Sequence, residues 1–332
     1  MVLALAVLLA ARPAVADSTN VFVVTAYNVA NWTRTDRDGV RDQPKPIAER
    51  EAVVQVLAQV RPDVLGVQEI GTTNDLAELA DRLAQRGLTY PYREWIEGAD
   101  FERHVALLSR FPIARRFSRT DYHYTQSTNR FWMSRGVLDV AIQVNDQFSF
   151  RAVVAHLKSR RVTNGADQAE MREAEARLLR GHIDSVLEHD PETDLLVIGD
   201  LNDTPGSEAI RTVLGTDPFR LVDLRPVDSH GGTGTHYWRF RQQFSRIDYL
   251  LASPALAKKL VAGSARIADG PGWLTASDHR ALSASFAVHP SNSAPRSAAS
   301  GVGRTSGHFS AIGLALGLVV AAVVSRRWLR RR

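Results

Sequence analysis

Short runs of apolar residues recur along the first 290 residues and are separated by segments with helical periodicity. Runs of roughly four to eight residues rich in Val, Ile, Leu and aromatic side chains are typical of β-strands. The sequence predicts strands at 21–27, 64–67, 105–108, 136–144, 148–155, 195–198, 247–251 and 282–288. Apolar residues at helical spacing predict helices between them, at 47–60, 75–85 and 166–187.

The predicted strands differ in how their apolar residues are arranged. Most are apolar throughout, which indicates burial on both faces, whereas the run at 137–144 alternates as a strand with one buried face does. Two packed sheets covered by helices would produce this mixture. No linker interrupts 17–290, so one large α/β domain is predicted there. The glycine-rich segment 231–235 opens no helix at the spacing of a phosphate-binding loop, and we predict a mobile loop.

The N-terminal residues have the features of a secretory signal peptide. An apolar run at 2–11 precedes Ala14, Val15 and Ala16, the small-x-small pattern that signal peptidase prefers. We therefore expect residues 1–16 to be removed, so that the mature chain begins near Asp17.

The C-terminal residues predict a membrane-associated segment. Residues 291–308 are rich in Ser, Ala and Gly without an acidic residue, a composition typical of a disordered linker. Residues 309–325 form an almost wholly apolar run, at the short end of the roughly 17–25 residues that span a bilayer. The basic tail at 326–332 would lie in the cytoplasm, which places the domain outside it. The segment fits both a transmembrane anchor and a sorting signal that is later cleaved.

Composition narrows the choice of ligands. The chain has no cysteine, which excludes disulfides and thiolate metal sites. The pI of 9.7 depends on the chain ends. Without Arg12 and the seven arginines after residue 290, 33 basic residues face 36 acidic ones, a net charge near −3. Bulk charge therefore gives no support for a polyanionic partner, although local cations could bind phosphate, namely Arg130, Lys158, Arg160 and Arg161.

Two predicted strands end in groups that bind metals and move protons. Gly199-Asp200-Leu201-Asn202-Asp203 follows one apolar run, and Ser277-Asp278-His279 precedes another. Carboxylates bind hard divalent cations through oxygen, and an imidazole beside them transfers protons near neutral pH. Each motif alone is a common turn sequence, but together they indicate a hydrolytic site.

Four further blocks complete the pattern: Tyr27-Asn28-Val29, Val67-Gln68-Glu69, His156-Leu157-Lys158-Ser159 and Arg246-Ile247-Asp248-Tyr249. With these blocks, the chain from about 21 to 288 resembles the endonuclease/exonuclease/phosphatase (deoxyribonuclease I-like) superfamily, and its bacterial extracellular members in particular. The resemblance implies a four-layer α/β/β/α sandwich of two mixed sheets flanked by helices. In this chain, a C-terminal transmembrane helix would follow it. It also implies a site where the strand ends of both sheets meet.

The resemblance also implies roles for individual residues. Glu69, Asp278 and Asn28 would hold Mg²⁺, for which Mn²⁺ is a possible substitute. His279 paired with Asp248 would serve the attack on phosphorus. The remaining roles fall to residues near the phosphate: Asp200 and Asn202 beside the attacking water and phosphoryl oxygens, His156 on a phosphate oxygen or the leaving group, and Lys158 and Asn202 in phosphate binding.

Several alternatives stay open from sequence alone. Either Asp200 or His279 could accept the proton from water, and Lys158 could be a surface cation. The leading function is a Mg²⁺-dependent extracytoplasmic nuclease, with nucleic acid as partner and membrane contact through the C-terminal helix. A sphingomyelinase-like hydrolase of phospholipids or small phosphoesters is the alternative, and a non-catalytic binding module on the same fold comes third. Nothing predicts an obligate protein partner.

Overall fold

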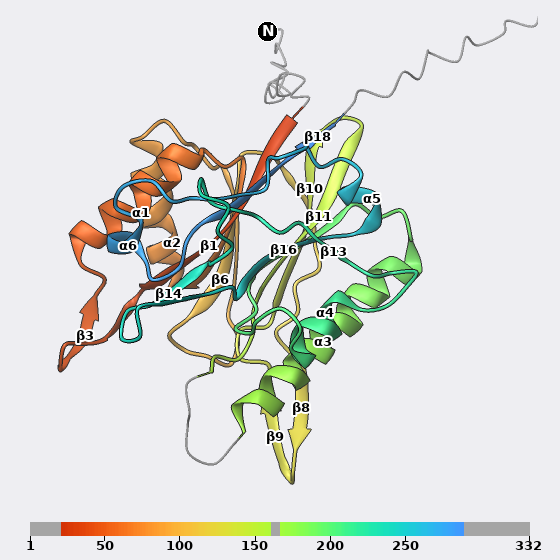
Figure 1. Cartoon of the computed structure of the whole chain (residues 1–332), viewed down its shortest axis with the longest axis horizontal. Coiled ribbons are helices and arrows are strands. Elements are labelled where there is room, and N and C mark those ends of the chain that lie inside the picture. Colours follow the sequence, from red (N-terminus) through yellow and green to blue (C-terminus); the bar gives the residue numbers. More distant parts are fainter. Residues whose placement is uncertain (1–20, 161–166, 289–332) are drawn as a thin grey trace, which may run out of the picture. The chain divides into compact units, whose positions relative to one another are not determined.

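Two six-stranded mixed sheets form the centre of the protein in the computed structural model, which describes residues 21–160 and 167–288 (Figure 1). The first sheet has the order β17-β18-β1-β4-β6-β5. In chain order its strands are β1 (Val21–Trp32), β4 (Val64–Ile70), β5 (Tyr92–Ile96), β6 (His104–Ser109), β17 (Arg266–Ile267) and β18 (Leu282–Ala287). Within it β1 and β4 are parallel, and the other pairs are antiparallel.

The second sheet has the order β13-β16-β12-β11-β10-β7. In chain order its strands are β7 (Ile113–Arg116), β10 (Val137–Asn145), β11 (Phe148–His156), β12 (Leu195–Asp200), β13 (Val222–Asp223) and β16 (Asp248–Ala252). Here β11 and β12 form the parallel pair. All eight predicted strands are present, because each carries enough apolar residues to fill a buried layer.

Helices lie on the outer faces of the sheets. They are α1 (Ile47–Val60), α2 (Thr73–Ala84), α3 (Gln168–His189), α4 (Glu208–Leu214), α5 (Pro254–Ala257) and α6 (Trp273–Ala276). The helix predicted at 75–85 begins two residues earlier because Thr72 caps it and forms a capping box with Asp75. The helix predicted at 166–187 begins after Asp167, whose side chain accepts hydrogen bonds from the next two free amides.

Three apolar cores separate the four layers. The central core lies between the sheets, where the Phe22 ring packs against Phe150 and Phe286 with centroids 5.0 and 5.6 Å apart. A second core joins the first sheet to α1 and α2, and a third joins the second sheet to α3 and α4. The predicted α/β/β/α sandwich is therefore confirmed.

The two sheets approach closely at Gly66 in β4. A Cβ atom built there would lie 2.5 Å from Cδ1 of Ile198 and 3.1 Å from a methyl group of Val154. Only a residue without a side chain fits between these strands without displacing a neighbour.

Three two-stranded hairpins extend from the sandwich, and the hydrophobic pattern predicts none of them. They pair β2 (Arg34–Arg37) with β3 (Val40–Pro44), β8 (His123–Gln126) with β9 (Asn129–Trp132), and β14 (His236–Trp238) with β15 (Gln243–Ser245). Their residues are mostly polar or exposed, so they lack the apolar signal that marks a buried strand. Figure 1 shows β8 and β9 projecting beyond the end of α3.

The predicted terminal segments lie outside the described residues. This applies to the signal peptide at 1–16, the linker at 291–308, the apolar helix at 309–325 and the basic tail. Within the ranges 21–160 and 167–288, the helices are too short or too polar to cross a membrane.

Candidate active site

Three neighbouring strands of the second sheet place His156, Asp200 and Asp248 side by side. His156 is the last residue of β11 and pairs with Asp200 at the end of β12, which pairs in turn with Asp248 at the start of β16. All three side chains are nearly fully buried. The register of the sheet therefore brings together three residues that lie far apart in the sequence.

The first sheet brings Asn28, Glu69 and His279 to the same place. Asn28 in β1 pairs with Gln68 of β4, and Glu69 follows at an irregularity in that strand. The Ser277 hydroxyl donates to the carbonyl of Asn28 at 2.8 Å and accepts from the amide of His279 at 3.0 Å. Ser277 thus fixes the loop before β18, so that the imidazole faces the second sheet.

Asp200 is the residue on which both sheets converge. The amide nitrogen of Asn28 donates to Asp200 Oδ2 at 3.1 Å, and the backbone amide of Asn202 donates to Oδ1 at 2.9 Å. Nε2 of His279 lies 3.7 Å from Oδ2, and Nε2 of His156 lies 3.6 Å from the same oxygen.

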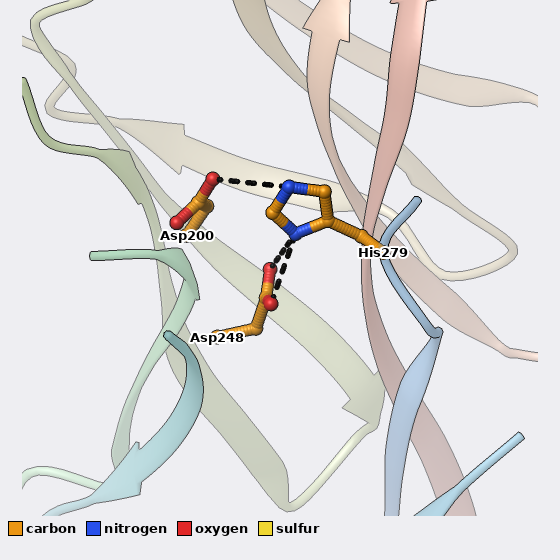
Figure 2. A group of neighbouring side chains, drawn as sticks. All are labelled: Asp200, Asp248 and His279. Carbon is orange, nitrogen blue, oxygen red and sulfur yellow. Dashed lines mark hydrogen bonds and ion pairs between the residues drawn. The ribbon is translucent and has the colours of Figure 1, made fainter. Parts of the chain in front are cut away.

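His279 lies between two carboxylates. Its Nδ1 is 3.0 Å from both oxygens of Asp248, while Nε2 points at Asp200 (Figure 2). Burial alone would lower the pKa of His279, but the charges of Asp248 and Asp200 outweigh burial and hold this pKa well above its usual range. The ring is therefore cationic and donates from both nitrogens.

His156 has the opposite electrostatic environment. Burial, reinforced by the positive charges of Arg135 and His279, lowers the pKa of His156 well below its usual range. Burial and the negative charge of Asp248 raise the pKa of Asp200 to about 7. The site thus pairs a neutral with a charged imidazole across one carboxylate, and such divergence of pKa values is typical of acid–base catalysis.

Strained backbone surrounds Glu69. Ala30, Asn31, Glu69 and Asn202 all have positive φ angles, between 49° and 61°, which non-glycine residues adopt only when their surroundings hold them. The amide of Asn31 donates to Glu69 Oε2 at 2.9 Å, and the Arg103 side chain donates to Asn31 Oδ1 at 2.7 Å. The turn at 30–31 thus fixes the orientation of the Glu69 carboxylate.

The donor atoms fit a divalent metal ion. Glu69 makes no ion pair with any residue in the described part of the chain, and the Asn28 amide nitrogen lies 3.3 Å from its Oε1. Oxygen donors of this kind suit Mg²⁺. Asp200, Asp248 and His279 also place one potential ligand atom each within 4.8 Å of one another. A metal at that second set would require His279 to lose its proton, since a protonated imidazole cannot bind a metal.

Asp278 and Lys158 lie differently from the sequence prediction. The Asp278 carboxylate faces His236, whose Nε2 is 3.8 Å away, and no contact joins it to Asn28 among the described residues. Lys158 was expected to lie on the strand face of His156, but that premise is wrong because β11 ends at His156. The backbone turns there: the Lys158 amide donates to buried Glu175 at 2.6 Å.

Asn202 lies at the site as predicted, with its side chain mostly buried. Its amide nitrogen donates to the carbonyl of Leu157 at 3.0 Å. This bond joins the loop after β12 to the loop after β11, so Asn202 also fixes the segment that carries Lys158.

Sequence reasoning left two supporting residues unassigned. Arg135 forms an ion pair with Asp100 at 2.7 Å, yet its Nε and Nη1 are buried without a hydrogen-bond partner in the described chain. Thr235 is fully buried and accepts hydrogen bonds from the amides of Ile247 and Asp248 at 3.0 and 3.1 Å. The loop predicted at 231–235 is thus anchored at its last residue. The Arg135-Gly136 pair before β10 was the one available signal for the first residue.

A cavity of about 560 Å³ lies elsewhere, between β10, β11 and α3. Arg151 and His182 line it, and both bind the buried carboxylate of Asp139. No predicted site residue lines this cavity. Its charged groups neutralise one another, which is the arrangement expected of a structural cluster.

Two mixed sheets packed face to face, with Asp, His and Asn side chains gathered where their strand ends meet, define a metal-dependent phosphoester hydrolase of the α/β/β/α class. The sequence profile described as "Endonuclease/Exonuclease/phosphatase family" matches residues 39–279. The chain belongs to this family and is a metal-dependent phosphoester hydrolase. No curated protein matches its sequence.

Solved structures with the same fold include proteins of different names. Truncated TDP2 from Caenorhabditis elegans is 19% identical, with a TM-score of 0.57 over 81% of this chain and 98% of its own. An endonuclease/exonuclease/phosphatase from Bacteroides vulgatus is 17% identical, with a TM-score of 0.57 over 81% and 99%. Sphingomyelinase C from Streptomyces griseocarneus is 17% identical, with a TM-score of 0.55 over 81% and 100%. At these identities the likeness shows the fold alone.

The contact between His279 and Asp248 yields a test of cooperation. We expect His279→Ala and Asp248→Ala each to lower the rate of phosphodiester hydrolysis by about two to three orders of magnitude, the scale of losing a positioned acid–base group. The double variant should be little slower than the slower single variant, because the pair acts as one unit. His189→Ala, which replaces an exposed histidine of α3, is the matched control. Fully multiplicative losses in folded variants, checked by circular dichroism, would contradict the pairing.

Proposed function

We propose that this protein is a Mg²⁺-dependent phosphodiesterase that hydrolyses nucleic acid outside the cytoplasm. The observation that carries the reaction is the arrangement around Asp200, with charged His279 on one side and neutral His156 on the other. A phosphoryl group bound between these rings would meet a proton donor on each side.

Glu69 and Asn28 would hold the metal ion, with Asp278 reaching it from the loop before His279. When bound, Mg²⁺ supplies positive charge to the phosphoryl oxygens. Assignment to Glu69 leaves the contacts of His279 with Asp248 and Asp200 intact. The alternative set of Asp200, Asp248 and His279 would break them.

The remaining roles follow from the contacts of each side chain. His279 holds a proton on both nitrogens and donates from Nε2 toward the phosphate, while Asp248 fixes its ring. Asp200 is then the group that accepts a proton from the attacking water. His156 stabilises a phosphate oxygen or the leaving group, Asn202 holds a phosphoryl oxygen, and Lys158 contributes positive charge from the adjoining loop.

Arg135 is an additional phosphate ligand in this proposal. Two of its nitrogens are buried without a hydrogen-bond partner in the described chain, and its charge acts directly on His156. Buried donors without acceptors are costly, and a phosphate oxygen is the acceptor that suits a guanidinium best.

The proposed location rests on the sequence of the chain ends. The signal-like residues 1–16 and the apolar run with terminal arginines agree on the side of the membrane. As an anchor or as a sorting signal, the C-terminal segment would keep the domain outside the cytoplasm.

The metal assignment predicts a specific defect in Glu69→Gln. This variant should need at least about tenfold more Mg²⁺ for half-maximal rate, since loss of metal-site groups typically weakens binding about 10- to 100-fold. Direct titration calorimetry with Mg²⁺ should show the same shift without any substrate. Glu208→Gln, an exposed carboxylate of α4, is the control. Unchanged Mg²⁺ binding by Glu69→Gln would place the ion elsewhere.

The substrate proposal predicts the outcome of a direct comparison. The full chain with Mg²⁺ should hydrolyse DNA or RNA oligonucleotides with a higher kcat/KM than sphingomyelin in mixed micelles or inositol phosphates. Excess chelator should abolish each activity, because the site uses oxygen donors. Preference for sphingomyelin would establish the lipid hydrolase alternative.

The location proposal predicts protease sensitivity in an expressing bacterium. Protease added to intact cells or spheroplasts should degrade the domain, while a cytoplasmic marker stays intact. Deletion of residues 291–332 should release active enzyme, since every residue assigned to chemistry precedes that segment. Full protection of the domain in spheroplasts would refute the extracytoplasmic assignment.

A further inference from the structure

The β14–β15 hairpin presents exposed aromatic rings and arginines directly beside the active site. Trp238 and Phe240 have exposed fractions of 49% and 87%, and Arg239 and Arg241 alternate with them. No acidic residue occurs from 236 to 246. Most large apolar side chains of the described chain are buried, so this tip requires an explanation.

The hairpin is attached to the catalytic residues through its backbone. His236 forms a β-bridge with His279, and the amide of Tyr237 donates to the carbonyl of Asp278 at 2.7 Å. The rings of His236 and His279 have centroids 4.7 Å apart. A ligand lying along the hairpin therefore leads into the site around Asp200.

The base of the hairpin is fixed, whereas its tip is exposed. Tyr237, Phe244 and Trp273 form an aromatic cluster with centroids 4.9 to 6.2 Å apart. Buried Arg280 lies against two of these rings and donates to the carbonyl of Gly234 at 2.9 Å. Trp238 and Phe240 lie beyond this cluster, so the tip is presented on a rigid support.

The β8–β9 hairpin repeats the combination on the side of His156. Arg130 lies over the ring of Trp132, with 5.1 Å to its centroid, and Trp132 is 48% exposed. Glu175 ties this hairpin to the loop after His156, because it accepts from the amides of Ser134 and Lys158. Aromatic rings with arginines thus adjoin the site on both sides.

We propose that the tips of β14–β15 and β8–β9 bind single-stranded nucleic acid, with bases stacked on Trp238, Phe240 and Trp132 and phosphates paired with the neighbouring arginines. Exposed ring faces are available to unstacked bases, which a duplex does not offer. The proposal rests on the proposed function and names the form of its substrate.

A membrane fits these tips less well. The guanidinium of Arg241 lies over the Trp238 ring, 5.2 Å from its centroid. Burying this ring in hydrocarbon would carry the charge with it at a large cost in free energy. Stacking on a base keeps the arginine at the phosphate backbone, where its charge is favourable.

The test compares Trp238→Ala/Phe240→Ala with Phe101→Ala in the full chain with Mg²⁺. Phe101 is also 87% exposed, but it lies between Asp100 and Glu102. The double variant should raise KM for a single-stranded oligonucleotide at least about tenfold, on the scale of lost base stacking. This loss should exceed any loss on bis(4-nitrophenyl) phosphate at least about tenfold, and it should be smaller on the annealed duplex. Phe101→Ala should leave KM within about twofold.

A binding measurement separates this inference from the proposed function. Fluorescence anisotropy of a phosphorothioate oligonucleotide should show at least about tenfold weaker binding by the double variant, and Arg239→Gln/Arg241→Gln should reduce the salt dependence by roughly 0.7 per lost contact. Binding through the hairpin without cleavage by the wild type would refute the nuclease function and support the inference. Cleavage with an unchanged KM in the double variant would overturn the inference alone. Lost sedimentation with sphingomyelin–phosphatidylserine vesicles and unchanged oligonucleotide binding would also overturn it.

Discussion

The buried carboxylate of Asp200 is the point on which the geometry of this site depends. An ionised group in the interior is costly unless charges and hydrogen-bond donors surround it. The second sheet supplies His156 and the amide of Asn202, and the first sheet supplies Asn28 and His279. Satisfying one carboxylate therefore requires both sheets to be in place, which makes assembly of the site a consequence of folding.

The electrostatic difference between the two histidines follows from their neighbours. His279 has a carboxylate at each nitrogen, whereas His156 is buried near Arg135 with its Nδ1 unpartnered in the described chain. Both imidazoles are equally withdrawn from water, so burial cannot distinguish them. Placement beside anions or cations sets the protonation of each ring before any substrate binds. Such preorganisation avoids reorienting dipoles during the reaction.

The sequence was most informative where strands end in chemical groups. Asp200, Asp248 and His279 could be predicted to meet because each adjoins a buried apolar run, and such runs define the sheets. The roles of Thr235 and Ser277 could not be predicted, since their contacts join residues far apart in the chain and serine or threonine occurs in any loop. The error at Lys158 arose from assuming a continued strand. Periodicity carries no signal for the buried bond to Glu175 that turns the chain there.

The exposed hairpins were missed for a related reason. Their strands pair with each other and bury little, so no alternation of apolar and polar residues is required. Their aromatic residues were visible in the sequence, but core packing was the commoner explanation for each. Only the exposed fractions separate Trp238 and Phe240 from the rings of the cores.

Gly66 gives the spacing of the sheets an importance beyond packing. It precedes Gln68 and Glu69 on β4, and the side chain it admits, Ile198, precedes Asp200 on β12. The separation of the two sheets near the site is thus set by backbone against a side chain, without an intervening pair of side chains. Any change that thickened this seam would lengthen the Asn28–Asp200 and His279–Asp248 contacts together. Interior volume at a chemically inert position therefore acts as a tolerance on catalytic alignment.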